Sequence, residues 1–420
     1  MNPERLSQAA IATRWLSCCS VVLACAFSSA CGGSSGSSTK NAAPVVAVSG
    51  ANVLPIAVNS GPAGLYVDGA FASATVCVPG SSTCQTIDGL LVDTGSSGLR
   101  ILSSALTVSL PQLSTSGGTT GQAAAAEPIA ECLPFLGSYT WGPVQAADVE
   151  IAGEKASSLP VQVLSDTAYP VPQGCTNFGL PSANSLSTLG ANGILGVGFY
   201  AQDCGAACAA AGTANPGLYY TCPSSGCQVA AVSATQQVQN PVSLFSSDNN
   251  GVIIELPAVS APAASLSGSL VFGIGTQSNN ALNGATVYAA DQNGNLTTAY
   301  KGKSYSTSFI DSGSNGYYFL DSTTTGIPDC TDLVGFYCPS STQNVSATVQ
   351  GANGNSGTVS FSIANADTLF SNNTDTVFNQ LGGPSSNMFD FGLPFFFGRN
   401  VFTAIEGKPT PGGTGPYWAY

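Results

Sequence analysis

The sequence contains no histidine among its 420 residues, and charged residues make up only 7% of it. The absence of histidine excludes Ser-His-Asp and Cys-His catalysis and every His-ligated metal site. Only 9 Lys and Arg residues stand against 22 Asp and Glu residues, which argues against nucleic acid as a partner. So few cations form few salt bridges that acid could break, so we expect good tolerance of acid. We expect no metal and no cofactor.

Long apolar helical periods are also missing, and no transmembrane helix or coiled coil is expected. Glycine is abundant at 49 residues and the hydrophobic fraction is 44%, which fits a folded extracellular protein better than a disordered one. Short apolar or alternating runs, such as "GLYVDGAFASATVCV", "NNGVIIELP" and "SGSLVFGIG", are broken by Gly, Pro, Asn and Ser. Many short strands with regular turn signals predict an all-β fold.

Residues 1–30 resemble a bacterial lipoprotein signal peptide. Arg5 and Arg14 precede an apolar segment over 15–27, which is shorter than the roughly 20 residues that span a bilayer. The small residues before Cys31 imply that Cys31 becomes the lipid-bearing N-terminus. Cleavage before Cys25 and ordinary secretion without a lipid are the alternatives.

The Gly/Ser-rich segment 31–49 predicts a flexible tether between this lipid and the folded domain. The protein is therefore expected to be exported to the bacterial cell envelope and held at the outer membrane by its lipid alone, or otherwise to be periplasmic or secreted. We expect a monomer that acts on a peptide or protein substrate and binds no nucleic acid.

Four of the 14 cysteines belong to the signal region, which leaves ten in the mature chain. An even number in an exported chain implies up to five disulfides. Cys77 with Cys84 and Cys330 with Cys338 are plausible local pairs, whereas the other pairings stay open. Metal binding is the competing interpretation of "CGAAC" and "CPSSGC". The four-cysteine segment 201–232 is expected to be a disulfide-stabilised loop.

Two segments of similar layout, "LLVDTGSSGLRIL" and "TSFIDSGSNGYYFL", lie in the two halves of the chain. In each, an apolar run predicts a buried strand, and an aspartate follows directly, Asp93 in the first and Asp311 in the second. A carboxylate at the end of a buried strand is costly unless it is paired or used. A single copy is explained by an ordinary Asp-Thr-Gly turn. Two copies predict two similar lobes that each donate one carboxylate to a shared site.

These segments, taken with three others, resemble the pepsin-like aspartic peptidases. "LLVDTGSSGL" and "SFIDSGS" are similar to the two active-site signatures, and "ANGILGVGFY" and "FDFGLPFFFGRNVFTAIEG" to the apolar-apolar-Gly strands that cross behind them. "SGSLVFGIGTQSNN" resembles the opening of the second lobe. The resemblance implies an all-β, bilobal pepsin-like fold, with a first lobe over 50–258, a second over 259–420 and the active site in the cleft between them.

The resemblance also implies roles for the two signatures. Asp93 and Asp311 would activate a water that hydrolyses a peptide bond, because two carboxyls in contact cannot both ionise cheaply and so share a proton as general base and general acid. The neighbouring residues would support them: glycines that let the loops approach, hydroxyls that hydrogen-bond across the pseudo-twofold axis, and serines that donate to the outer carboxylate oxygens. These are Gly95 and Gly313, Thr94 and Ser312, and Ser96 and Ser314.

Three positions depart from the family pattern. Arg100 replaces a tryptophan that usually packs near the flap, and near the dyad it would push activity to lower pH. The usual flap sequence is missing, and "SYTWG" is the nearest candidate, with Tyr139 or Trp141 at the tip. Asp390 occupies an expected apolar position, unless Phe396–Gly398 is the true equivalent.

Other functions compete with the peptidase interpretation. Because of Arg100 and the atypical flap, the chain could be a catalytically silent binding or scaffold lipoprotein on the same fold. A carbohydrate-binding protein or glycosidase shares paired carboxylates, but those need not lie in matched turns. Lys301 and Lys303 precede the second signature and suggest a solvated turn rather than a Ser-Lys dyad.

Overall fold

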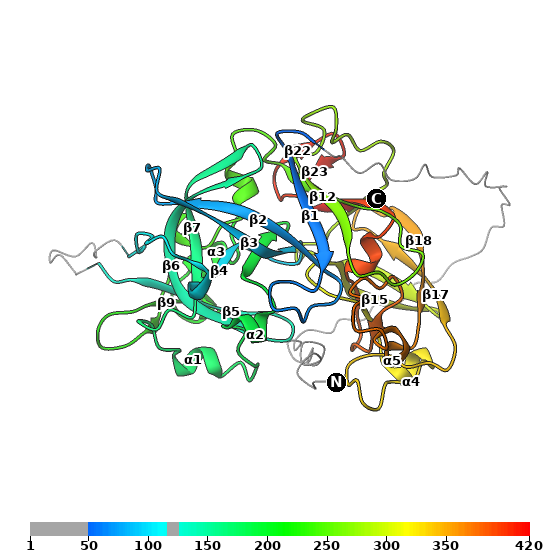
Figure 1. The fold of residues 1–420 in the computed structure, drawn as a ribbon. Helices are drawn as coiled ribbons and strands as arrows, with labels where there is room; N and C mark the ends of the chain where they lie inside the picture. The colour runs from blue at the N-terminus through cyan, green and yellow to red at the C-terminus, as the bar shows by residue number, and fades with distance from the viewer. Residues whose placement is uncertain (1–48, 116–125) are drawn as a thin grey trace, which may run out of the picture.

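The computed structural model describes residues 49–115 and 126–420 (Figure 1). The predicted signal peptide, the acylation sites Cys31 and Cys25, and all but the last residue of the predicted tether lie outside the described residues. Among the residues that the structure does describe, no helix is long and apolar enough to cross a membrane.

The expected all-β, two-lobed fold is confirmed. One large sheet contains the strands of the first lobe and several from the C-terminal part of the chain. In sheet order its strands are β10 (Gln228–Val229), β9 (Tyr219–Thr221), β5 (Ile129–Pro134), β6 (Tyr139–Ile151), β7 (Glu154–Leu164), β4 (Ser97–Leu102), β8 (Gly193–Val197), β3 (Cys84–Asp93), β2 (Gly69–Cys77), β1 (Val53–Asn59), β12 (Leu266–Phe272), β11 (Gly251–Leu256), β21 (Arg399–Ala404), β24 (Tyr417–Ala419) and β13 (Val287–Ala289).

A second sheet forms most of the second lobe. Its strands in order are β18 (Ser356–Ile363), β17 (Gln343–Gln350), β14 (Leu296–Tyr300), β15 (Lys303–Ile310), β20 (Phe389–Phe391), β16 (Tyr317–Phe319) and β19 (Gly382–Gly383), and β22 (Pro409–Thr410) pairs separately with β23 (Gly413–Thr414). The α-helices in the described residues are single turns: α1 (Gln173–Thr176), α2 (Leu186–Leu189), α3 (Ala206–Ala209), α4 (Ser322–Thr325) and α5 (Ala366–Leu369).

The two lobes share the large sheet. Antiparallel pairing of β1 with β12 joins the start of the first lobe to the start of the second, and β11 pairs with β21 near the C-terminus. In Figure 1, β2, β6 and β7 lie on one side of β1 and β12, while β15, β17 and β18 lie on the other. The lobes are therefore held together by backbone hydrogen bonds as well as by side-chain packing.

The buried faces of the strands follow from the sequence pattern. Along β17, Val345, Ala347 and Val349 are buried while the residues between them are exposed, as expected for a strand with one covered face. The core of the second lobe is rich in aromatic rings, and Phe319 and Phe389 stack there at 5.3 Å between centroids. This packing holds β16, the strand that follows the second Asp-Ser-Gly loop, against β20, which also pairs with β15 before the loop.

Candidate active site

Each of the two aspartates stands at the end of a strand that pairs in parallel with a second strand. In the first lobe, β3 lies beside β8, and Asp93 is in register with Gly196. In the second lobe, β15 lies beside β20, and Ile310 is in register with Phe391. The main-chain N–H of Asp311 then donates to the carbonyl oxygen of Phe391. The two loops therefore have the same local construction.

This register shows which glycine of the second lobe corresponds to Gly196 of the first. Gly392 follows Phe391 as Gly196 follows Leu195, and a β-carbon on either glycine would lie within 3 Å of the neighbouring backbone. The segment Asp390-Phe391-Gly392 is thus the equivalent of Ile194-Leu195-Gly196, and the alternative with Phe396–Gly398 is wrong. Asp390 consequently occupies the position that holds an isoleucine in the first lobe.

The structure brings the carboxyls of Asp93 and Asp311 together. The backbone N–H of Gly95 donates to Oδ1 of Asp93 at 2.8 Å and to Oδ1 of Asp311 at 3.0 Å. The N–H of Gly313 donates to Oδ1 of Asp311 at 2.7 Å. A β-carbon at Gly95 would lie 2.6 Å from the Asp311 carboxyl, and one at Gly313 would lie 2.6 Å from Oδ1 of Asp93. Only glycine allows the two loops to approach this closely.

Two hydroxyl residues lock the loops across the pseudo-twofold axis. The N–H of Thr94 donates to Oγ of Ser312 at 3.1 Å, and the N–H of Ser312 donates to Oγ1 of Thr94 at 2.9 Å. Oγ of Ser312 donates in turn to the carbonyl oxygen of Val92 at 2.8 Å. These reciprocal bonds are buried, so losing either partner would leave an unsatisfied group in the core.

The outer oxygen of each carboxyl hydrogen-bonds with a serine hydroxyl. Oγ of Ser96 hydrogen-bonds with Oδ2 of Asp93, and Oγ of Ser314 lies 3.1 Å from Oδ2 of Asp311. The second serine has another neighbour, since its Oγ also lies 2.6 Å from Oδ2 of Asp390. The two halves of the site thus differ in what lies behind the serine.

Burial and neighbouring charge raise the pKa of Asp311 well above its usual range. Burial is the largest cause, and the charges of Asp93 and Asp390 add to it, while the Gly313 N–H acts in the opposite direction. Burial likewise raises the pKa of Tyr66, with the two aspartates as further causes. Its hydroxyl donates to the carbonyl oxygen of Gly313 at 3.4 Å. This tyrosine, from the loop between β1 and β2, is a site neighbour that carries no local sequence signal.

Solvent reaches the site from the side of the two glycine loops. Asp93 is 6% exposed and Asp311 is 8% exposed, whereas Gly95 is exposed and Ser96 and Gly313 are half-buried. The pair is therefore shielded but not sealed. Such an arrangement can keep a proton on one carboxyl while a small molecule reaches the other.

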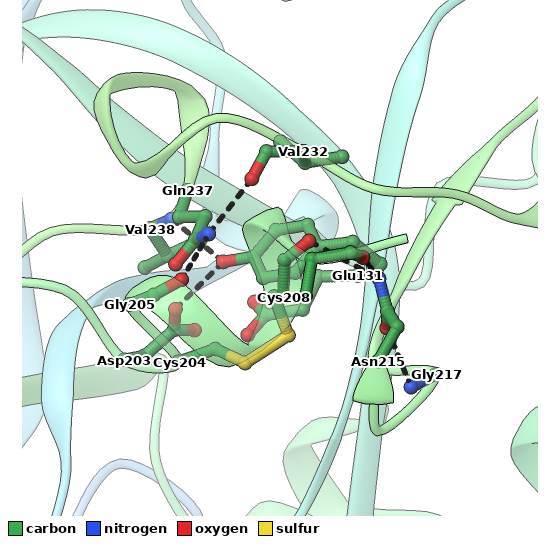
Figure 2. Close-up of a disulfide and its surroundings, with 12 residues drawn as sticks. Glu131, Asp203, Cys204, Gly205, Cys208, Asn215, Gly217, Val232, Gln237 and Val238 are labelled. Carbon is green, nitrogen blue, oxygen red and sulfur yellow. Dashed lines mark hydrogen bonds between the residues drawn. A yellow bond between two sulfur atoms is a disulfide. The ribbon is translucent and has the colours of Figure 1, made fainter. Parts of the chain in front are cut away.

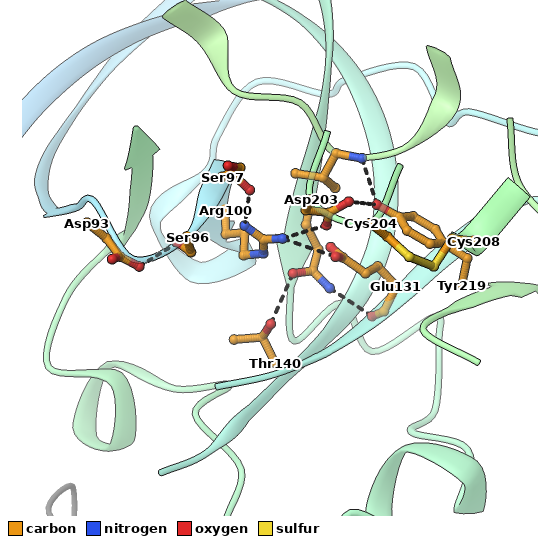
Figure 3. A network of polar contacts seen from close by, with 12 residues as sticks. Asp93, Ser96, Ser97, Arg100, Glu131, Thr140, Asp203, Cys204, Cys208 and Tyr219 are labelled. Atoms are coloured by element: carbon orange, nitrogen blue, oxygen red, sulfur yellow. Dashed lines mark hydrogen bonds and ion pairs between the residues drawn. A yellow bond between two sulfur atoms is a disulfide. The ribbon is translucent and has the colours of Figure 1, made fainter. Parts of the chain in front are cut away.

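Arg100 does not act on the dyad in the way that the sequence suggests. Its guanidinium donates to Oε1 of Glu131 at 3.0 Å, to Oδ2 of Asp203 at 2.8 Å and to the carbonyl oxygen of Ser97 at 2.9 Å (Figure 3). The charge is therefore paired, and the two carboxylates raise the pKa of Arg100 despite its burial, which acts to lower it. Figure 3 shows the side chain directed to these partners and away from Asp93.

This buried network connects the segment 201–232, through Asp203 and Arg100, to Glu131 of strand β5. The hydroxyl of Tyr219 donates to Oδ1 of Asp203 at 2.7 Å, and the next residue, Cys204, forms a disulfide with Cys208 (Figure 2). Burial raises the pKa of Asp203 well above its usual range, and the negative charge of Glu131 adds to the effect. The four-cysteine segment is thus anchored to the core and is more than a surface loop.

The predicted flap residues lie in a hairpin but not at its tip. Tyr139 pairs with Pro134, so the tip consists of residues 135–138. Tyr139 is 6% exposed and Trp141 is 1% exposed, because their rings pack into a first-lobe cluster instead of facing solvent. The expectation of either residue at the tip is wrong.

The tip is closed by a backbone hydrogen bond, and its two apolar residues lie in different surroundings. The N–H of Phe135 donates to the carbonyl oxygen of Ser138 at 2.7 Å, and the Phe135 ring lies 5.9 Å from the Arg100 guanidinium carbon. Leu136 is 48% exposed. Sequence reasoning could have found this turn through Gly137, which follows the two apolar residues.

The ten cysteines of the described residues form five disulfides, so the predicted maximum is reached. Both predicted local pairs, Cys77–Cys84 and Cys330–Cys338, are confirmed, and the others are Cys132–Cys175, Cys204–Cys208 and Cys222–Cys227. The metal interpretation of "CGAAC" and "CPSSGC" is wrong, because their sulfurs are bonded to each other. Within the described residues, one cluster of potential metal donors is found, namely Cys330, Cys338 and Asp367. Its two cysteines form the Cys330–Cys338 disulfide, so their sulfurs cannot ligate a metal as thiolates.

Comparison with known proteins assigns the chain to a family of unknown function. A family model described as "Protein of unknown function (DUF3443)" matches residues 48–420. The chain belongs to this family. No curated protein matches it. Among solved structures, the DUF3443 chain is similar to an aspartic proteinase from Irpex lacteus, at 13% identity and a TM-score of 0.47, over 87% of this chain and 96% of that chain.

Proposed function

We propose that this protein is an aspartic endopeptidase, in which the Asp93–Asp311 pair activates a water that hydrolyses the peptide bond. The observation that carries the proposal is the single N–H of Gly95, which reaches the inner oxygen of both carboxyls. Two acids held this close share a proton, and one can then take a proton from water while the other gives one to the carbonyl oxygen of the substrate.

The surroundings of the two acids suggest how the first step is divided. The raised pKa of Asp311 favours the shared proton on this residue, so Asp311 would protonate the substrate oxygen. Asp93 would accept the proton of the attacking water, and the roles would exchange when the leaving amine is protonated. Ser96 hydrogen-bonds with the outer oxygen of Asp93 and stabilises negative charge there, whereas the Gly95 N–H donates to both acids.

Cleavage of denatured casein by the purified chain, followed from acidic to neutral pH, tests this function. Asp93→Ala and Asp311→Ala should each slow cleavage by at least about a hundredfold. Asp88→Ala is the matched control, because Asp88 is an exposed residue of the same strand β3 and should keep the wild-type rate. Cleavage at close to the wild-type rate in either dyad variant, with both variants folded, would reject the proposal.

A silent binding or scaffold protein on the same fold is the second candidate. The low exposure of both aspartates favours it, since a peptide must reach them for hydrolysis. Folded wild-type protein that cleaves nothing at any pH, yet binds extended peptides whether or not Asp93 is present, would decide for this candidate.

We further propose that the protein is exported and held at the bacterial outer membrane through a lipid on Cys31. Five disulfides support export, because such bonds persist in oxidising compartments. Metabolic labelling with a fatty-acid analogue should mark the wild type and not Cys31→Ser. Label that persists in Cys31→Ser and is lost in Cys25→Ser would assign the lipid to Cys25 instead.

A further inference from the structure

A third carboxyl, that of Asp390, lies behind Asp311. Oγ of Ser314 lies between them, 3.1 Å from Oδ2 of Asp311 and 2.6 Å from Oδ2 of Asp390. Asp390 is 3% exposed, and its Oδ1 is buried without a hydrogen-bond partner. The equivalent residue of the first lobe is the apolar Ile194, so this third acid belongs to the second lobe alone.

The hydrogens around Ser314 cannot satisfy two ionised neighbours. A serine hydroxyl has one hydrogen and donates it to one acceptor, so one of the two carboxylate oxygens would face the serine oxygen without a proton between them. A proton on Oδ2 of Asp390 removes this conflict, because Asp390 then donates to Ser314 and Ser314 donates to Asp311. A neutral acid also tolerates the unpartnered Oδ1 far better than a buried carboxylate does.

The opposite arrangement, with Asp390 ionised, lacks a compensating cation. The ion pairs within residues 49–115 and 126–420 all involve Arg100 or Lys155, so Asp390 has none. A single buried carboxylate without a cation is strongly disfavoured. The geometry therefore favours a neutral Asp390.

The groups that face Asp390 from the neighbouring elements are acidic or neutral. On β16, Tyr318 is in register with it, and on β15 the apolar Phe309 is in register. Burial is the largest cause that raises the pKa of Asp390 to about 8; the Ser314 hydrogen bond opposes it and the charge of Asp93 adds to it.

We propose that Asp390 is a positioning residue that holds a proton at neutral pH and, through Ser314, fixes a donated hydrogen bond on the outer oxygen of Asp311. The inner oxygen of Asp311 is then left to carry the proton shared with Asp93. Ionisation of Asp390 would draw the Ser314 hydrogen away from Asp311 and place a negative charge beside the dyad. The effect on catalysis rests on the proposed peptidase function, whereas the proton on Asp390 does not.

The first test is independent of activity. The full chain is labelled with carbon-13 at the aspartate carboxyls, and the signal missing in Asp390→Asn identifies Asp390. Its chemical shift should be that of a protonated acid near neutral pH and should titrate around the value of about 8. A carboxylate shift throughout mildly acidic and neutral pH would overturn the proposal.

The second test compares the pH profiles of casein cleavage in two variants. Asp390→Asn keeps an N–H donor for Ser314 and should retain the wild-type rate at acidic pH while keeping activity further into alkaline pH. Asp390→Leu has no donor and should lose about tenfold to hundredfold. Identical losses in the Asn and Leu variants, or none in either, would contradict the positioning role. If the wild type cleaves nothing, the peptidase proposal fails and the carbon-13 titration alone decides for Asp390.

Discussion

The two aspartate loops are alike along the chain and differ in the residues behind them. In the first lobe, Arg100 of β4 is in register with Ile194 of β8. In the second lobe, the equivalent pair is Tyr318 of β16 with Asp390 of β20. The first lobe thus puts its buried ionisable side chain, the charged Arg100, on the outer strand and directed away from the dyad, while the second puts its own, the neutral acid Asp390, on the crossing strand beside Ser314. A pseudo-symmetric pair of carboxyls therefore acquires two unequal environments.

The largest expected effect comes from breaking the charge network of the first lobe. Arg100→Met leaves Glu131 and Asp203 buried without their cation, and removal of one partner of a buried ion pair costs about 3–5 kcal/mol. Urea unfolding measures the loss. Lys155→Met is the control, because its pairs with Asp148 and Glu150 involve an exposed cation and should matter little. An unchanged unfolding midpoint for Arg100→Met would mean that the network does not stabilise the first lobe.

Gly95→Ala and Gly313→Ala test whether the loops remain symmetric where they touch. Each new β-carbon would lie 2.6 Å from an atom of the opposite carboxyl, so both variants should lose about 1–3 kcal/mol through overpacking, together with most of any peptidase activity. Thermal unfolding and casein cleavage measure the two effects. A wild-type melting temperature in either variant would show that the loops can separate freely.

Stability should fall as pH rises, because of the second lobe. Asp390 has a folded-state pKa of about 8, above the value of about 3.9 for an unfolded aspartate. The folded state therefore binds more protons between these values, and the stabilisation is complete below about pH 3.9 and lost as pH rises through about 8. One such group gives a slope of up to about 1.4 kcal/mol per pH unit.

Urea unfolding over this range checks the slope, which should be shallower in Asp390→Asn than in the wild type. An equal slope in both proteins would show that Asp390 does not contribute to the pH dependence of stability. Asp311 contributes in the same direction, since its pKa is also raised. The tolerance of acid expected from composition stays a prediction, and the same unfolding series tests it.

The smallest effect is expected at the counterpart of Arg100. Tyr318→Phe removes one hydrogen bond, from the Tyr318 hydroxyl to Oδ1 of Asn315 at 2.6 Å, which is worth about 1 kcal/mol. Thermal unfolding should therefore separate this variant clearly from Arg100→Met. Equal destabilisation by the two substitutions would show that Arg100 stabilises the first lobe no more than Tyr318 stabilises the second.

The sequence predicted the parts of the site that lie within short segments. The two Asp-(Thr/Ser)-Gly-Ser stretches identify Asp93 and Asp311, and the all-β class follows from the short apolar runs. The two local disulfides also follow from spacing, because Cys77 and Cys84 are close enough along the chain to close a hairpin.

The parts that sequence reasoning missed depend on register and on long-range contacts. Glu131 and Asp203 lie far from Arg100 along the chain, so no local pattern pairs them with it. Asp390 was noticeable as a charge within an apolar run, but its contact with Ser314 follows only from the pairing of β20 with β15. The hairpin tip precedes the aromatic residues that suggest a flap, because Trp141 is buried and fills the core.

The most direct test of the central claim is a double-mutant comparison of casein cleavage by Asp93→Asn, Asp311→Asn and the double variant. If the two carboxyls act as one catalytic unit, each single substitution should slow cleavage by about a hundredfold to ten-thousandfold, and the double variant should be no slower than either. Losses that multiply in the double variant, or a wild-type rate in either single variant, would contradict a shared dyad.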